Sequence, residues 1–160
     1  MIVNFKSLSK NSRVWIFQSL DFIDDRVVEV IKEKISLFLN GWKSHQIDFK
    51  SSFEIRYNTF IIVAADESNL VSGCSIDSLV NFIKNLETSF DLQLLDKLHV
   101  KYIDNGEIET KHLDEFKTYC KNLDKDQKLI VFNNLVKNIR ELENNWKVNI
   151  NDSWHKRYIK

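Results

Sequence analysis

Apolar residues follow two periods along the first half of the chain, and each period indicates one type of element. The apolar run at 14–17 is rich in β-branched and aromatic residues, which is typical of a buried strand. Apolar and charged residues alternate over 53–57, and a fully apolar run follows at 60–65, after Asn58-Thr59. The second and third segments therefore predict a β-hairpin with one half-buried strand and one buried strand.

Two further segments place apolar residues at steps of three and four, which predicts helices. The first helix can be capped by Asp24 or Asp25, and Gly41 suits its C-terminal end. The second follows the loop 66–73, and one of its faces carries Ile76, Leu79, Val80, Ile83 and Leu86. A strand at 99–104 comes next. Asn105-Gly106 then predicts a tight turn into an antiparallel strand at 107–110.

The rest of the chain predicts a helix over 113–123, a short strand over 129–132 and a final helix over 135–146, followed by fourteen irregular residues. The order of elements up to 104 is strand, helix, strand, strand, helix, strand. This is the order of an α+β ferredoxin-like (split βαβ) fold, in which two helices cover one face of an antiparallel sheet. We therefore predict a single domain over 1–160, with a core over about 12–110 and an extension over about 111–160.

The sheet face opposite the helices of such a fold is a natural dimer surface. We expect Trp15 or Phe17 to face away from the helices, which favours a covered face. A homodimer would cover it, and so would the helices between 113 and 146 within one chain.

Charge and cysteine content limit the partners and the compartment. Lys and Arg together number 23, as do Asp and Glu, so the net charge is zero. The sequence therefore has no excess of positive charge that would favour binding to nucleic acid or to an anionic membrane. The two cysteines form no disulfide framework, which is typical of a reducing compartment. The start of the chain does not resemble a signal peptide, and the longest apolar run is too short to span a membrane. We expect a cytoplasmic protein that binds neither nucleic acid nor membrane.

Several kinds of chemistry need motifs that the sequence lacks. With glycine only at 41, 73 and 106, it has no phosphate loop, no dinucleotide-binding fingerprint and no nucleophile elbow. The four histidines and two cysteines are scattered, without a C-x-x-C pair or a pair at helical ligand spacing. We therefore predict no metal site and no cofactor.

One short segment, Ser72-Gly73-Cys74-Ser75-Ile76-Asp77, carries the candidate chemistry at the start of the second helix. Ser72 or Ser75 can cap that helix, and Gly73 lets a ligand approach the backbone. We expect Asp77 in the first turn, where the helix dipole favours a carboxylate. Free N–H groups at a helix N-terminus bind anions, and the same position stabilises the thiolate of Cys74.

These features favour a non-enzymatic module that uses Ser72, Gly73, Cys74, Ser75 and Asp77 to bind a small anionic ligand or a protein partner. The alternative is a thiol enzyme with Cys74 as the nucleophile and His45 or His155 as the base. A third interpretation is a merely structural Cys74, and we expect a structural role for Cys120.

Five segments, in order along nearly the whole chain, resemble a family of short, uncharacterised bacterial proteins: 11–18, 52–58, 72–77, 131–136 and 153–155. Members of this family sometimes carry the label "ABC transporter ATPase". The resemblance implies no catalytic residues. The label also conflicts with the residues, because the chain has neither a phosphate loop nor an ABC signature.

Overall fold

The computed structural model describes residues 1–66, 71–124 and 126–159. Its contacts divide the chain into two compact units, Met1–Leu95 and Asp96–Lys160. Each unit has an apolar core of its own and is described separately below.

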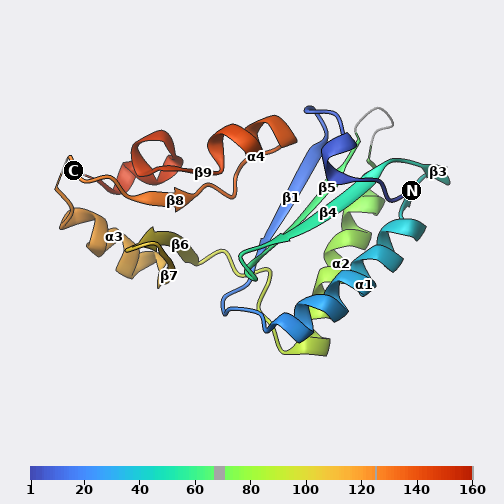
Figure 1. Cartoon of the computed structure of the whole chain (residues 1–160), viewed down its shortest axis with the longest axis horizontal. Coiled ribbons are helices and arrows are strands. Elements are labelled where there is room, and N and C mark those ends of the chain that lie inside the picture. Colours follow the sequence, from blue (N-terminus) through green and yellow to red (C-terminus); the bar gives the residue numbers. More distant parts are fainter. Residues whose placement is uncertain (67–70, 125, 160) are drawn as a thin grey trace. The chain divides into compact units, whose positions relative to one another are not determined.

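The first unit is built on a three-stranded antiparallel sheet with strand order β1-β5-β4, and both of its long helices lie on the same side of that sheet (Figure 1). The bounds of these elements are β1 Arg13–Gln18, α1 Asp25–Gly41, β4 Ser51–Arg56, β5 Phe60–Ala65 and α2 Gly73–Phe90. A two-residue turn joins β2 (Lys43–Ser44) to β3 (Ile47–Asp48), and a short 3-10 helix covers Phe5–Ser7.

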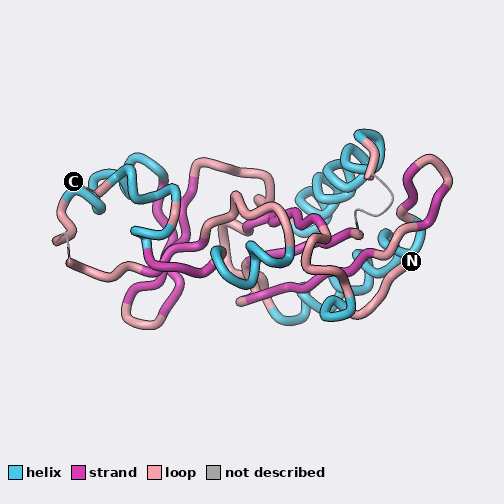
Figure 2. The backbone as a smooth tube through the Cα atoms, turned by 90° about the horizontal axis from the view of Figure 1, so that it is seen from above, coloured by secondary structure: helices cyan, strands magenta, loops and turns pink. Residues whose placement is uncertain are grey.

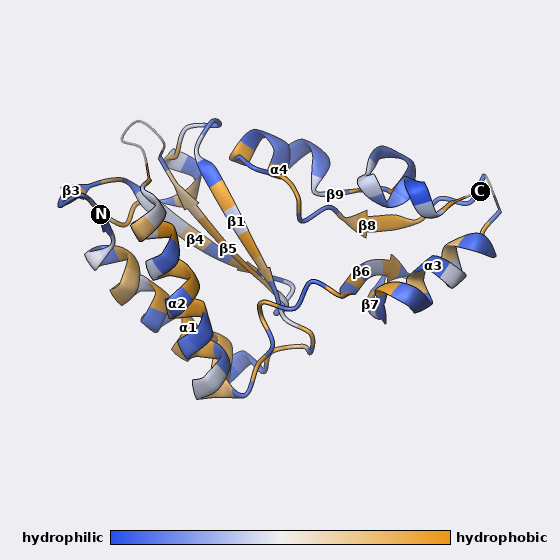
Figure 3. Cartoon of the chain, turned by 180° about the vertical axis from the view of Figure 1, so that it is seen from behind, coloured by the Kyte–Doolittle hydropathy of each residue, from blue (hydrophilic) through white to orange (hydrophobic). Residues whose placement is uncertain are grey.

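The core of this unit lies between the sheet and the two helices. Its fully buried side chains include Ile31 and Ile35 of α1, and Leu79 and Ile83 of α2. In Figure 3 both helices carry hydrophobic and hydrophilic stretches, as expected for helices with one buried face. Phe17 belongs to this core and Trp15 packs against it. The expectation that one of these aromatics faces away from the helices is therefore wrong, because residues two apart on a strand share a face.

The second unit is built on a small antiparallel sheet with strand order β7-β6-β8-β9, whose strands are magenta in Figure 2. The bounds of its elements are β6 His99–Asp104, β7 Glu107–His112, α3 Leu113–Lys121, β8 Ile130–Phe132, α4 Ile139–Asn145, β9 Lys147–Asn149 and two 3-10 helices, Ile150–Asp152 and Trp154–Tyr158. Phe116, Cys120, Val131 and Ile150 are fully buried in its core.

Both units combine helices with antiparallel sheets, which confirms the α+β class. The first three strands also have the order expected of a split βαβ fold. The complete ferredoxin-like topology is not confirmed, because His99–Asp104 pairs with β7 and β8 rather than with β1. The two-residue Asn105-Gly106 turn brings β7 to one edge of β6 at a small entropic cost, and β8 pairs with the other edge, where a ferredoxin-like fold would have β1.

Two expectations for the C-terminal part are wrong. The last helix begins at Ile139 instead of 135, because Asn138 caps it with its side chain, and Leu135 lies outside it and is exposed. The final residues, which we expect to be irregular, contain β9 and two 3-10 helices. Within the described residues, no helix combines the length and the hydrophobicity needed to cross a membrane.

Candidate functional site

The N-terminus of α2 is closed by a pair of serines. Ser72 is the N-cap residue, and its Oγ accepts a hydrogen bond of 3.2 Å from the Ser75 main-chain N–H. The two hydroxyl oxygens also lie 2.8 Å apart, within hydrogen-bond distance. Of the two expected caps, Ser72 is therefore the one that occupies the capping position, and Ser75 supports it from inside the first turn.

The segment that follows α1 holds this cap in place. Trp42 Nε1 donates to the Ser75 carbonyl oxygen over 2.8 Å, and Ser75 Oγ donates to the Lys43 carbonyl oxygen over 2.7 Å. The Ser72 main-chain N–H donates to Ser44 Oγ over 3.2 Å. Trp42, Ser44 and Ser75 are all buried; the Trp42–Ser75 hydrogen bond is shielded from water, and the other two are partly shielded. The start of α2 is consequently fixed to the base of the β2–β3 hairpin.

The first two residues of α2 are open to approach. Among the described residues, no atom lies within 4 Å of the place where a Cβ on Gly73 would stand. Cys74 is exposed. The main-chain N–H groups of Gly73 and Cys74 belong to the first turn, which has no carbonyl acceptors of its own. Unpaired donors of this kind at the start of a helix suit a phosphate or a carboxylate.

Asp77 does not lie in the first turn of α2, contrary to the expectation from the sequence. The helix begins at Gly73, so Asp77 is its fifth residue, and the first turn contains no acidic side chain. The helix therefore starts three residues earlier than a cap at Ser75 would require. This change leaves the N-terminal positive end of the helix dipole without a carboxylate of its own to compensate it.

His45 lies at the tip of the β2–β3 hairpin, next to Ser44. Its φ of 50° and that of Gln46, 65°, are left-handed, as a two-residue hairpin turn requires. The side chain is exposed. Within the described part of the chain, no hydrogen bond joins His45 to Cys74, although Ser44 and Ser72 connect the two segments.

His155 is in the second unit, whereas Cys74 is in the first. Its ring is 2% exposed, its Nδ1 lies 2.6 Å from Ser153 Oγ, and Phe116 packs against it edge to face. Burial, and to a smaller extent the nearby Arg157, lowers the pKa of His155 from 6.5 to about 4. A histidine with so low a pKa is a weak base at neutral pH, which does not suit the role of general base.

Cys120 is fully buried in the core of the second unit, where burial raises the pKa of its thiol to about 11. A buried thiol with a raised pKa carries almost no thiolate at neutral pH and is unreactive. The expectation of a structural Cys120 thus agrees with its position.

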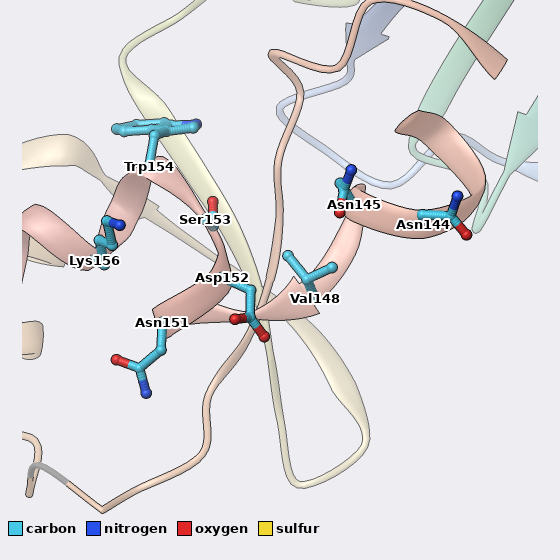
Figure 4. Close-up of a pocket in the computed structure, with 8 residues that line it drawn as sticks. All are labelled: Asn144, Asn145, Val148, Asn151, Asp152, Ser153, Trp154 and Lys156. Carbon is cyan, nitrogen blue, oxygen red and sulfur yellow. The ribbon is translucent and has the colours of Figure 1, made fainter. Parts of the chain in front are cut away.

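The sequence does not reveal a polar groove in the second unit, which is drawn in Figure 4. Its volume is about 620 Å³, and its walls come from the end of α4, from β9 and from both 3-10 helices. The lining residues are Asn144, Asn145, Val148, Asn151, Asp152, Ser153, Trp154 and Lys156. The sequence gives one weak indication of this groove, the high proportion of Asn and Asp over 144–152. Such amides and charges suit a polar, hydrogen-bonding ligand.

Comparison with protein-family models, with curated proteins and with solved structures finds no match to this chain.

Proposed function

We propose that this protein is a non-enzymatic binding module that takes up a small anionic ligand at the N-terminus of α2. The observation that carries the proposal is the first turn of this helix, where Gly73 and Cys74 are exposed and no residue of the turn is acidic. Phosphate and carboxylate groups accept hydrogen bonds from main-chain N–H groups, so they are the chemical groups that this end of the helix favours.

The rigidity of the cap supports the same proposal. Ser72 and Ser75 are held by Trp42, Lys43 and Ser44 through three hydrogen bonds of 2.7–3.2 Å. Donors that are already fixed lose little entropy when a ligand binds, which favours affinity.

The test is a titration with inorganic phosphate, followed by the amide NMR signals of residues 73 and 74. We expect these two signals to shift together and to saturate with one dissociation constant. If phosphate shifts only the amide signals of exposed lysines and their neighbours, and not those of residues 73 and 74, the proposal is contradicted.

A matched pair of variants at Gly73 sharpens the test. Gly73→Pro removes one N–H donor at the first helical position, where proline is tolerated, and Ser72 already has the extended backbone (φ −73°, ψ 161°) that precedes proline. Gly73→Ala keeps the donor and meets no described atom within 4 Å. We expect phosphate affinity to fall about tenfold in the proline variant, as for one charge-assisted hydrogen bond, and to persist in the alanine variant.

A second candidate function is that of a thiol enzyme with Cys74 as nucleophile. The exposure of Cys74 at a helix N-terminus favours it. Of the two candidate bases, His45 suits it better than His155, since His45 is exposed and adjoins Ser44, which accepts the Ser72 N–H.

We also propose a cytoplasmic location and membership in the bacterial family that the chain resembles. The two free cysteines support a reducing compartment. A homodimer stays a prediction, and sedimentation of the purified protein at several concentrations would test it.

A further inference from the structure

The β6–β7 hairpin brings together two histidines that lie thirteen residues apart in the sequence. His99 and His112 are paired across the two strands, at the end of the ladder farthest from the Asn105-Gly106 turn. Their rings stand edge to face, at 89°, with centroids 5.3 Å apart. Their side chains are 24% and 40% exposed, so solvent and small ions can reach them.

The separation of the two rings suits a shared metal ion. An imidazole nitrogen binds zinc at about 2.0–2.1 Å, and the ring centre lies about 1.2 Å behind that nitrogen. Two rings that meet at one ion with a tetrahedral angle therefore have centroids about 5 Å apart. The 5.3 Å between His99 and His112 is close to that value.

Asp96 prepares His99 for this role. Asp96 Oδ2 lies 2.7 Å from His99 Nδ1, which places the ring proton on Nδ1 and the lone pair on Nε2. Asp96 is itself fixed, since its Oδ1 accepts the Leu98 N–H over 2.6 Å. A carboxylate that orients a histidine in this way is a common outer partner of protein metal ligands.

His112 also has a carboxylate nearby, farther from its ring than Asp96 is from the ring of His99. Its Nδ1 accepts the Asp114 main-chain N–H over 3.3 Å, and Asp114 Oδ2 lies 3.8 Å from the same nitrogen. When Nε2 binds an ion, the ring proton moves to Nδ1, which then gives up the Asp114 N–H and can donate to the Asp114 carboxylate once that carboxylate moves closer than 3.8 Å. Each histidine would then have one carboxylate partner behind it.

We propose that His99 and His112 form a two-histidine site for a divalent transition metal ion, bound through both Nε2 atoms, with water in the remaining positions. The described residues contain no group of three or more His, Cys, Asp or Glu placed to hold a metal. The bound ion therefore keeps open positions. Imidazole ligands of this kind favour Cu²⁺ over Ni²⁺ and Zn²⁺. This site is independent of the anion site on α2.

The experiment is a calorimetric titration of the full chain with Cu²⁺ and, separately, with Zn²⁺. His99→Gln keeps a donor for Asp96, and His112→Asn keeps an N-cap acceptor for α3, so both variants are designed to fold. His45→Asn is the matched control, because His45 also lies on a hairpin but has no histidine opposite it within that ladder. We expect one ion per chain, a loss of affinity of about tenfold or more in either variant, and no change in the control.

Two further measurements separate ligands from general surface binding. Asp96→Asn retains an oxygen for Leu98 but weakens the support of His99, and we expect about 10- to 100-fold weaker binding. In the unaltered protein, Cu²⁺ should broaden the NMR signals of residues 99 and 112 before those of 45. Equal affinity of both histidine variants and the unaltered protein, or loss of binding in the control, would overturn the proposal.

Discussion

Trp42 Nε1 donates a buried hydrogen bond of 2.8 Å to the carbonyl oxygen of Ser75. Trp42 is the C-cap residue of α1, and Ser75 lies in the first turn of α2, so one indole connects the two helices of the first unit. The same indole packs against the rings of Trp15, Phe38 and Phe49, at centroid distances of 4.8–5.7 Å. The geometry of the candidate anion site therefore depends on the core beneath it.

Trp42→Phe should lower the free energy of unfolding by about 1–3 kcal/mol. The change removes the donor for a buried carbonyl oxygen and leaves a small cavity. Urea denaturation measures the loss. Trp15→Phe is the control, since Trp15 belongs to the same aromatic cluster but makes no side-chain hydrogen bond to the described residues, and its effect should be smaller.

Ser72→Ala should destabilise the protein by about 1 kcal/mol, the usual effect of removing an N-cap side chain. Ser72→Asp keeps an oxygen acceptor for the Ser75 N–H and should preserve stability. Because the Ser72 and Ser75 hydroxyls lie 2.8 Å apart, the double variant with Ser75→Ala should lose less than the two single variants added together. Strict additivity in urea denaturation would mean that the two serines act independently.

Replacing two glycines by alanine should have opposite effects on stability. Gly106 has a φ of +79° in the β6–β7 turn, so Gly106→Ala forces a left-handed alanine and should cost about 1 kcal/mol. Gly41 is the last residue of α1, and no described atom lies within 4 Å of a Cβ added there. Gly41→Ala should stabilise the protein by about 0.4–1 kcal/mol. Thermal denaturation of both variants, side by side, provides the comparison.

Much of the secondary structure could be predicted from the sequence because it depends on local patterns. The step pattern of α1 and its cap at Asp24, and the β4–β5 hairpin, follow from residues that are neighbours along the chain. The pairing partner of His99–Asp104 is a long-range property. The apolar alternation of this strand suits any sheet, and it does not tell whether β1 or β8 pairs with the edge that β7 leaves open.

The candidate site was predictable in part for the same reason. The helix start near Ser72 follows from its capping residue, whereas the β2–β3 hairpin that supports it was missed. Its turn is His45-Gln46, and neither residue is a typical left-handed turn former. The pairing of His99 with His112 could have been predicted, since a two-residue turn at Asn105-Gly106 places these residues opposite each other. The sequence pattern predicts the return strand only to 110, and the structure extends it to His112.

The two thiols should react at very different rates in the folded protein. Cys74 is exposed, whereas Cys120 is fully buried with a pKa of about 11. We expect iodoacetamide to alkylate Cys74 selectively, and Cys120 only after unfolding, as read by mass spectrometry of the peptides.

The pH dependence of this reaction decides between the two candidate functions. An apparent pKa well below about 8.5 for Cys74 that is lost in His45→Asn would favour the thiol enzyme. A Cys74 with ordinary thiol reactivity, or no effect of His45→Asn, would leave the binding module as the better account.

The stability of the protein should fall on acidification through His155. In the unfolded chain this histidine takes up a proton as the pH falls through about 6.5, whereas in the folded protein its pKa is about 4. The unfolded state therefore binds the extra proton between these values, so the contribution of His155 is fully present above about pH 6.5 and is lost progressively down to about pH 4. The loss attributable to this residue is on the order of 3 kcal/mol.

His155→Phe isolates this effect, since it keeps an aromatic ring beside Phe116 but cannot take up a proton. The variant should be less stable at pH 7, because Ser153 Oγ loses the ring nitrogen 2.6 Å away. The difference in unfolding free energy between the two proteins, measured in urea from pH 7 to pH 4, should then shrink or reverse as the pH falls. A difference that stays constant over this range would show that His155 titrates alike in the folded and unfolded states, which its 2% exposure argues against.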